Sequence, residues 1–117
     1  MDFPENFDAL VAKSDELGLY TKLINQLNKD LALANIDLSF NEDTMPTSLK
    51  LILQETIYKL INEKFTDYLN LLYIIDVSEE KIKRLMSNDT LVISEQVTFL
   101  VLKREWQKVW FKNQYGS

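Results

Sequence analysis

The chain has 117 residues, of which 46% are hydrophobic, and it carries a formal net charge of −5 with no cysteine and no histidine. This length suits one domain (1–117) with a core, and the high apolar content with two glycines excludes a disordered or turn-rich β class. Without cysteine there is no disulfide or thiolate site. Histidine is the usual general base near neutral pH and the commonest transition-metal ligand. We therefore expect no enzymatic activity, no cofactor and no metal.

The charge is divided unevenly along this acidic chain. Residues 1–80 hold 15 acidic side chains and six lysines, whereas residues 81–117 hold seven basic and three acidic side chains. We expect the acidic front to pack against the basic tail, either within the fold or in a second copy, since charge blocks on small helical proteins are usually solvated faces.

Two helices are predicted in the first third of the chain. Residues 4–13 place Phe7, Leu10 and Val11 on one face. Residues 16–35 carry an apolar stripe, and Gly18 is either a break or a tolerated weak point in one longer helix. The polar side of the second helix is expected to face solvent, and it comprises Lys22, Asn25, Gln26, Lys29 and Asp30.

Residues 36–45 do not continue the helical pattern. Ile36, Leu38 and Phe40 alternate with polar residues, a period of two that fits a short strand or an extended connection. We favour the connection, because no partner strand is evident. The polar turn at 41–44 has the oxygen atoms that a hard cation needs, but it lacks the spacing of a helix–loop–helix calcium site, so no metal is expected there.

Residues 47–75 form the most apolar long segment and are predicted to be the central helix. Pro46 suits the helix entrance, and Thr47 or Ser48 can cap it. On a helical projection the apolar arc covers roughly 180°, wider than the ~100° stripe of an ordinary surface helix. Several helices, or a second copy, are needed to cover such an arc. A bend is expected near Asn70.

The last third is predicted to hold a short helix and a long one. Ser78 is a good N-cap for residues 79–87, which point Ile82, Leu85 and Met86 inward. The turn at 87–90 can cap a helix over residues 91–114. The predicted fold class is thus all-α, a small bundle of four to five helices organised around the long helices 47–75 and 91–114.

The C-terminal helix mixes aromatic and basic residues. At helical spacing, five apolar residues form a stripe that suits either the core or an interface, and they are Phe99, Leu102, Trp106, Val109 and Trp110. Cations beside ring faces also suit phosphates and unpaired bases. The anion-binding candidates are Lys103, Arg104, Lys108 and Lys112.

Mid-helix acids are the remaining group that could line an interior, and they are Glu55, Glu63, Asp67 and Glu105. A carboxylate-bridged metal bundle also needs Glu-x-x-His partners, which this chain lacks. A histidine-free enzyme would require a pocket that gathers two or more acids with raised pKa values.

The function that these patterns favour is non-catalytic protein binding, by an adaptor or a homodimer, with another protein or a second copy as the partner. The alternative is an anionic ligand, nucleic acid or a lipid surface, at the C-terminal helix. A pI near 4.7 argues against nucleic acid. The apolar runs 69–75 and 97–102 fall short of the ~20 residues of a membrane span. The acidic N-terminus does not resemble a signal peptide, so we expect a cytoplasmic protein.

Overall fold

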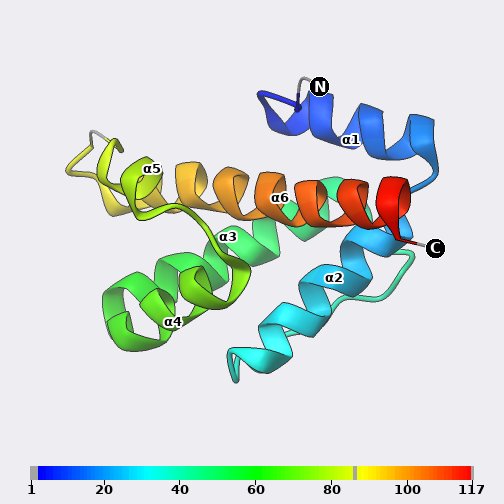
Figure 1. Cartoon of the computed structure of the whole chain (residues 1–117). Helices are drawn as coiled ribbons and strands as arrows, with labels where there is room; N and C mark the ends of the chain where they lie inside the picture. Colours follow the sequence, from blue (N-terminus) through cyan, green and yellow to red (C-terminus); the bar gives the residue numbers. More distant parts are fainter. Residues whose placement is uncertain (1–2, 86, 117) are drawn as a thin grey trace.

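The computed structural model describes residues 3–85 and 87–116, which form six helices in a body of 38 × 28 × 24 Å (Figure 1). The described ranges contain no strand, so the predicted all-α bundle is confirmed. The helices are α1 (Phe7–Leu17), α2 (Tyr20–Leu33), α3 (Pro46–Glu63), α4 (Phe65–Ile75), α5 (Glu79–Lys83) and α6 (Thr90–Tyr115).

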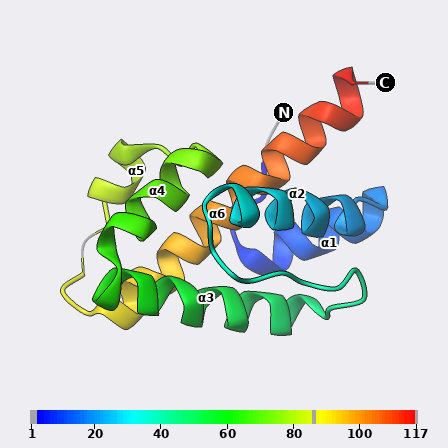
Figure 2. The same ribbon diagram turned by 90° about the horizontal axis from the view of Figure 1, so that it is seen from below.

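Helix α6 lies at the centre of the bundle, packed against α1, α2, α3 and α4 (Figures 1 and 2). Its buried apolar side chains include Val97, Val101, Leu102 and Trp106. They meet the buried stripe of α2 and the buried side of α3. Both segments predicted to be long helices, 47–75 and 91–114, supply the core. The central element with neighbours on most sides is α6, and not residues 47–75 as predicted.

The predicted helix over 47–75 is two helices, which is why the bundle has one helix more than expected. Lys64 leaves the helical region with φ −142° and ψ 63°, and it ends α3 and begins α4. The chain turns six residues before Asn70, where a bend was expected. The buried residues keep a helical spacing across the break, so periodicity did not reveal it: Leu49, Leu53, Ile57 and Leu60 in α3, then Tyr68, Leu71, Leu72 and Ile75 in α4.

Most helix ends follow local sequence rules. Gly18 has φ +65°, a left-handed conformation that ends α1 and makes the break real. Ser78 and Asp89 cap α5 and α6 through their side chains. The expected cap at Thr47 or Ser48 is wrong, because Pro46 is already the first helical residue and Met45 is the N-cap.

The short helix α5 ends at Lys83, earlier than the predicted residue 87. Ile82 and Leu85 are half-buried against the core, as the spacing indicated. Met86, predicted to point inward with them, lies outside the described residues.

The connection between α2 and α3 is extended and includes residues 36–40, as favoured from the sequence. It is held by a side chain instead of a second strand. Asn28 Nδ2 donates to the carbonyl of Phe40, and the N–H of Phe40 donates back to Asn28 Oδ1, both at 2.8 Å. Tyr20 Oη fixes the end of the segment by donating to the Thr44 carbonyl at 2.7 Å.

Candidate functional site

The predicted aromatic stripe of α6 is core along most of its length. Leu102, Trp106 and Val109 are buried within the one chain, so they cannot meet a partner in the folded state. Phe99 and Trp110 are half-buried at the two ends of the stripe. Only these two of the five interface candidates are available for contact with another molecule.

The four predicted anion-binding residues do not share one free surface. Arg104 pairs with Asp76 Oδ2 at 3.1 Å and also donates to its carbonyl. Lys103 lies over the ring of Phe99, 6.0 Å from the centroid. Lys108 pairs with an acid of α2, and Lys112 bonds an amide of α2. The basic tail therefore packs against the acidic front of the same chain, one of the two arrangements expected from the charge division.

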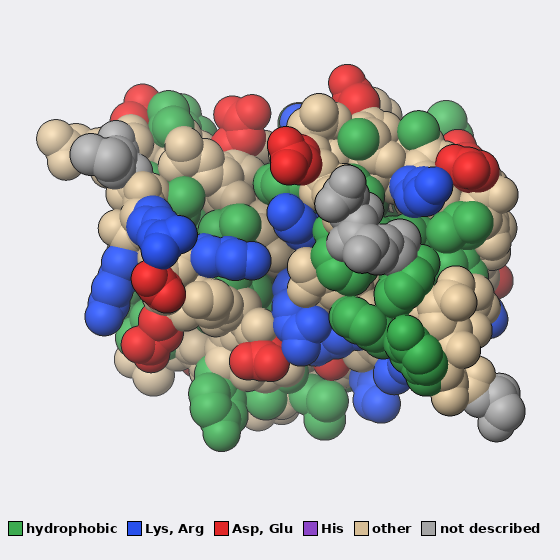
Figure 3. All heavy atoms as spheres, turned by 45° about the horizontal axis from the view of Figure 1, so that its top comes forward, with side chains coloured by type: hydrophobic (Ala, Val, Ile, Leu, Met, Phe, Trp, Pro, Cys, Tyr) green, Lys and Arg blue, Asp and Glu red, His purple; other side chains and the backbone are tan. Residues whose placement is uncertain are grey.

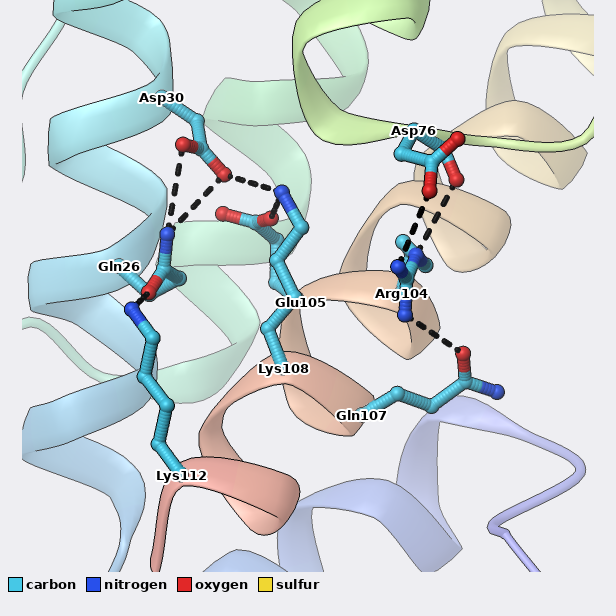
Figure 4. Close-up of polar contacts among 8 residues, drawn as sticks. All are labelled: Gln26, Asp30, Asp76, Arg104, Glu105, Gln107, Lys108 and Lys112. Carbon is cyan, nitrogen blue, oxygen red and sulfur yellow. Dashed lines mark hydrogen bonds and ion pairs between the residues drawn. The ribbon is translucent and has the colours of Figure 1, made fainter. Parts of the chain in front are cut away.

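A buried polar cluster joins α2 to α6 (Figure 4). Lys112 Nζ donates to Gln26 Oε1 at 2.6 Å, and Gln26 Nε2 donates to both oxygens of Asp30 at 3.3 Å. Lys108 Nζ lies 2.8 Å from Asp30 Oδ2 and 3.3 Å from Glu105 Oε1. Gln26, Asp30 and Lys108 were expected to face solvent. That expectation is wrong because α2 packs against α6 at these residues. The rest of the polar side of α2, which comprises Lys22, Asn25 and Lys29, is exposed as expected.

Two carboxyl groups and one ammonium share this enclosed cluster, so one carboxyl is expected to be neutral. Burial, followed by the neighbouring Asp30 carboxylate, raises the pKa of Glu105 to about 9. The contacts with Glu105, Lys108 and Gln26 outweigh burial at Asp30 and lower its pKa. Within the described residues neither Glu105 oxygen accepts a hydrogen bond. A protonated Glu105 can donate to the Asp30 carboxylate that faces it (Figure 4).

The two buried acids lie away from the main surface grooves. Asp30 and Glu105 line none of the five grooves described among residues 3–85 and 87–116. Only Glu105 of the two has a raised pKa. The other three mid-helix acids, Glu55, Glu63 and Asp67, are exposed. The arrangement stabilises the contact of α2 with α6.

A different face of the molecule keeps large apolar side chains in water. Phe65, Leu69 and Tyr73 occupy positions i, i+4 and i+8 of α4 and are 54%, 50% and 82% exposed. Beside them, a groove of about 500 Å³ separates α4 from α5. Its apolar lining includes Leu72, Val77 and Ile82. We call the three residues and this groove the α4 face.

A second apolar surface lies at the end of α6. Trp110, Phe111 and Tyr115 stack or meet edge to face, and Phe3 packs on Trp110 with 5.8 Å between ring centroids. Figure 3 shows hydrophobic side chains gathered beside the C-terminal end of the chain. Phe111 and Tyr115 of this cluster are themselves 44% and 79% exposed, but each ring contacts others of the cluster. The α4 face has one such contact, between Phe65 and Tyr68.

The sequence pattern missed both the buried cluster and the α4 face. Asp30 follows the polar side of a normal amphipathic stripe, and no local pattern indicates that a second helix would cover that side. The only available indication was Glu105, an acid among apolar residues of the C-terminal helix. For the α4 face, the local indication was Lys64. It lies four residues after Leu60, at a position where a continuous buried stripe would have an apolar residue.

Comparison with known proteins adds no relative. No protein-family model matches the chain, and no match was found among curated proteins or among solved structures. None of the helices formed by the described residues combines the length and apolar character needed to cross a membrane.

Proposed function

We propose that this chain is a non-catalytic protein-binding module that associates with a second copy of itself through the α4 face. The observation that carries the proposal is the exposed row of Phe65, Leu69 and Tyr73. Burying such side chains stabilises association by about 25 cal/mol for each Å² of apolar surface removed from water. Aromatic anchors next to a hollow are typical of the residues that carry interface energy.

A twofold contact suits the charges at the ends of α4. If two α4 helices pair antiparallel with Leu69 opposite its copy, Phe65 of each meets Tyr73 of the other. Along the helix axis, Lys64 of one copy then lies only about two residues, or ~3 Å, away from Asp76 of the other copy. Asp76 already pairs with Arg104 of its own chain through Oδ2, so Lys64 would add a second cation beside that carboxylate at each end of the contact. A twofold interface uses the same patch on both subunits, which this arrangement provides.

The apolar surface also continues beyond the row on α4. A stable interface buries about 800 Å² on each partner. The row on α4 and the neighbouring groove between α4 and α5 together offer a continuous surface across two helices. A copy that covers the row can place its own Tyr73 near the groove that Ile82 lines.

Light scattering over about 5 to 200 µM tests the proposal, because most dimers of this size form in or below that range. We expect the wild type to approach a dimer mass and the Leu69→Glu variant to remain a monomer with the same helical content. Leu33→Glu is the matched control, since Leu33 is similarly exposed at the end of α2. A wild type that stays monomeric at 200 µM would exclude self-association, and equal dissociation of both variants would exclude the α4 face.

A further inference from the structure

We infer that the groove between α2 and the end of α6 binds a small phosphate-bearing molecule. The inference is independent of the α4 face and uses different residues. The groove has a volume of about 500 Å³, within the range of small-molecule sites. Its polar lining consists of Lys22, Asn25, Gln26, Lys29, Lys112 and Asn113.

The lining comes from matched faces of two helices. On α2, residues 22, 25, 26 and 29 follow the spacing i, i+3, i+4 and i+7, which places them on one side. Residues 109, 112, 113 and 116 repeat the same spacing along α6 and its C-cap, and they complete the lining. Two such faces in contact form a groove whose polar side chains all point into the same space.

The chemistry of this groove is cationic, although the chain as a whole is acidic. Its lining holds three lysines, three amides and no carboxylate. Within the described residues Lys22, Lys29 and Lys112 have no acid within 4.0 Å, whereas Arg104 has one and Lys108 has two. Two acids contact lining residues from outside the groove: Asp30, which pairs with Lys108, and Glu42, which accepts from the Asn25 amide at 3.3 Å and keeps its negative charge.

One lysine is held ready by the buried cluster. Lys112 Nζ uses one of its three protons for Gln26 Oε1. Gln26 is only 9% exposed and is itself held by Asp30. Figure 4 shows Lys112 reaching Gln26 from α6 at the outer edge of this cluster. The remaining two protons are free to bind an anion, and an ammonium fixed beforehand loses less entropy when it does so.

The ligand class follows from the number and type of donors. Three ammonium groups balance two or three negative charges, as carried by a phosphate monoester or a pyrophosphate group. Lysine binds phosphate oxygens as a point charge, without the planar geometry that arginine needs. A long polyanion is disfavoured, because the acidic remainder of the molecule would repel the strands on either side of the groove. A compact phosphate group fits inside the cationic region alone.

Titration calorimetry with sodium pyrophosphate at 50 mM salt tests the site, using the full chain. We expect saturable binding of one pyrophosphate per chain. The double variant Lys22→Gln, Lys112→Gln should bind at least about tenfold more weakly, because it loses two charge-assisted contacts. The control Lys59→Gln, Lys81→Gln makes the same change in net charge on exposed side chains outside both this groove and the α4 face, and its affinity should stay within about twofold.

Two further measurements distinguish binding in this groove from binding elsewhere on the chain or at a lipid surface. In an NMR titration, the side-chain amide signals of Asn113 and Gln26 should move with the same saturation curve as the heat. A flotation assay with vesicles that contain an anionic phospholipid should show no recruitment. The inference would be overturned by absent pyrophosphate binding, by equal losses in both double variants, or by recruitment to vesicles without binding of free pyrophosphate. Dimerisation of the wild type has no bearing on these outcomes.

Discussion

The C-terminal helix α6 and the outer side of α4 are both rich in large apolar side chains, yet only α6 is enclosed. Four helices surround α6, and Trp106 is completely buried. The outer row of α4 stays half or more exposed, although the inner side of the same helix is well buried. An apolar surface thus becomes core only where the topology supplies helices to cover it. Part of the polar side of α6 is also covered by α2, and Glu105 is completely buried there.

The strongest test of this contrast compares aromatic residues in the two regions. Trp106→Ala should lower the free energy of unfolding by about 3–5 kcal/mol, because it leaves a large cavity. Tyr73→Ala should change the stability of the monomer by no more than about 0.5 kcal/mol, as expected at an exposed position. Urea unfolding at low protein concentration measures both values. A similar loss in the two variants would show that the α4 row is covered within one chain.

A second test addresses the enclosed polar side of α6. Lys108→Met should lower the free energy of unfolding by about 3 kcal/mol at pH 7, because it leaves the buried Asp30 carboxylate without its cation. Lys83→Met provides an exposed control, for which a change within about 0.5 kcal/mol is expected. If the two variants proved equally stable in urea unfolding, the pair of Lys108 with Asp30 would contribute no net stability.

The buried carboxyl predicts an unusual dependence of stability on pH. Glu105 has a pKa of about 9 in the folded state and an ordinary value of 4.5. Folding therefore takes up a proton between these values, and this group makes the free energy of unfolding fall as pH rises. Asp30, whose pKa is lowered, contributes in the opposite direction and only in more acidic solution.

Replacing Glu105 with glutamine isolates that contribution. The amide is always neutral and can donate to Asp30, so Glu105→Gln should resemble the wild type in stability at pH 5. At pH 8 the variant should be the more stable by on the order of 3 kcal/mol, because its folding requires no proton uptake. Thermal unfolding at a series of pH values provides the comparison. Parallel profiles for the two proteins would contradict a protonated Glu105.

The smallest effect on the free energy of unfolding is expected on the α4 face. Substitutions there should weaken dimer formation without destabilising the monomer. Combining Leu69→Glu with Tyr73→Glu should leave the unfolding free energy of the monomer within about 1 kcal/mol, since both side chains are exposed. The same variant should abolish the dimer. Circular dichroism and sedimentation, performed on one sample, would check both statements. Loss of helical structure would show that this row belongs to the folded core.

The sequence was sufficient for the fold class and for most helices, because the relevant patterns are local. The caps Ser78 and Asp89 and the alternation over residues 36–40 depend on a few adjacent side chains. The break at Lys64 was missed because the buried residues on its two sides keep one helical spacing and neither glycine nor proline marks it. A single lysine in the line of that stripe was not enough to indicate a break. Its position is set by how α3 and α4 pack on the same neighbours, which is information from the tertiary structure.

The candidate sites were much less predictable. Periodicity correctly placed Trp106 on an apolar stripe but could not distinguish a core from an interface. Lys108 and Lys112 have the same appearance in the sequence, yet Lys108 contacts two buried acids and Lys112 lines a groove. The difference depends on where α2 crosses α6, nearly 80 residues away along the chain. A rule that considers one helix at a time cannot predict where two helices cross.

The pairing of Asn28 with Phe40 has a consequence for how the chain avoids misassembly. An extended segment with unpaired amides is a template on which another polypeptide can add as a strand. Here a helix side chain supplies the donor and the acceptor that such an intruder would use, both at 2.8 Å. The backbone groups of Phe40 are thereby closed to cross-β growth within the extended run.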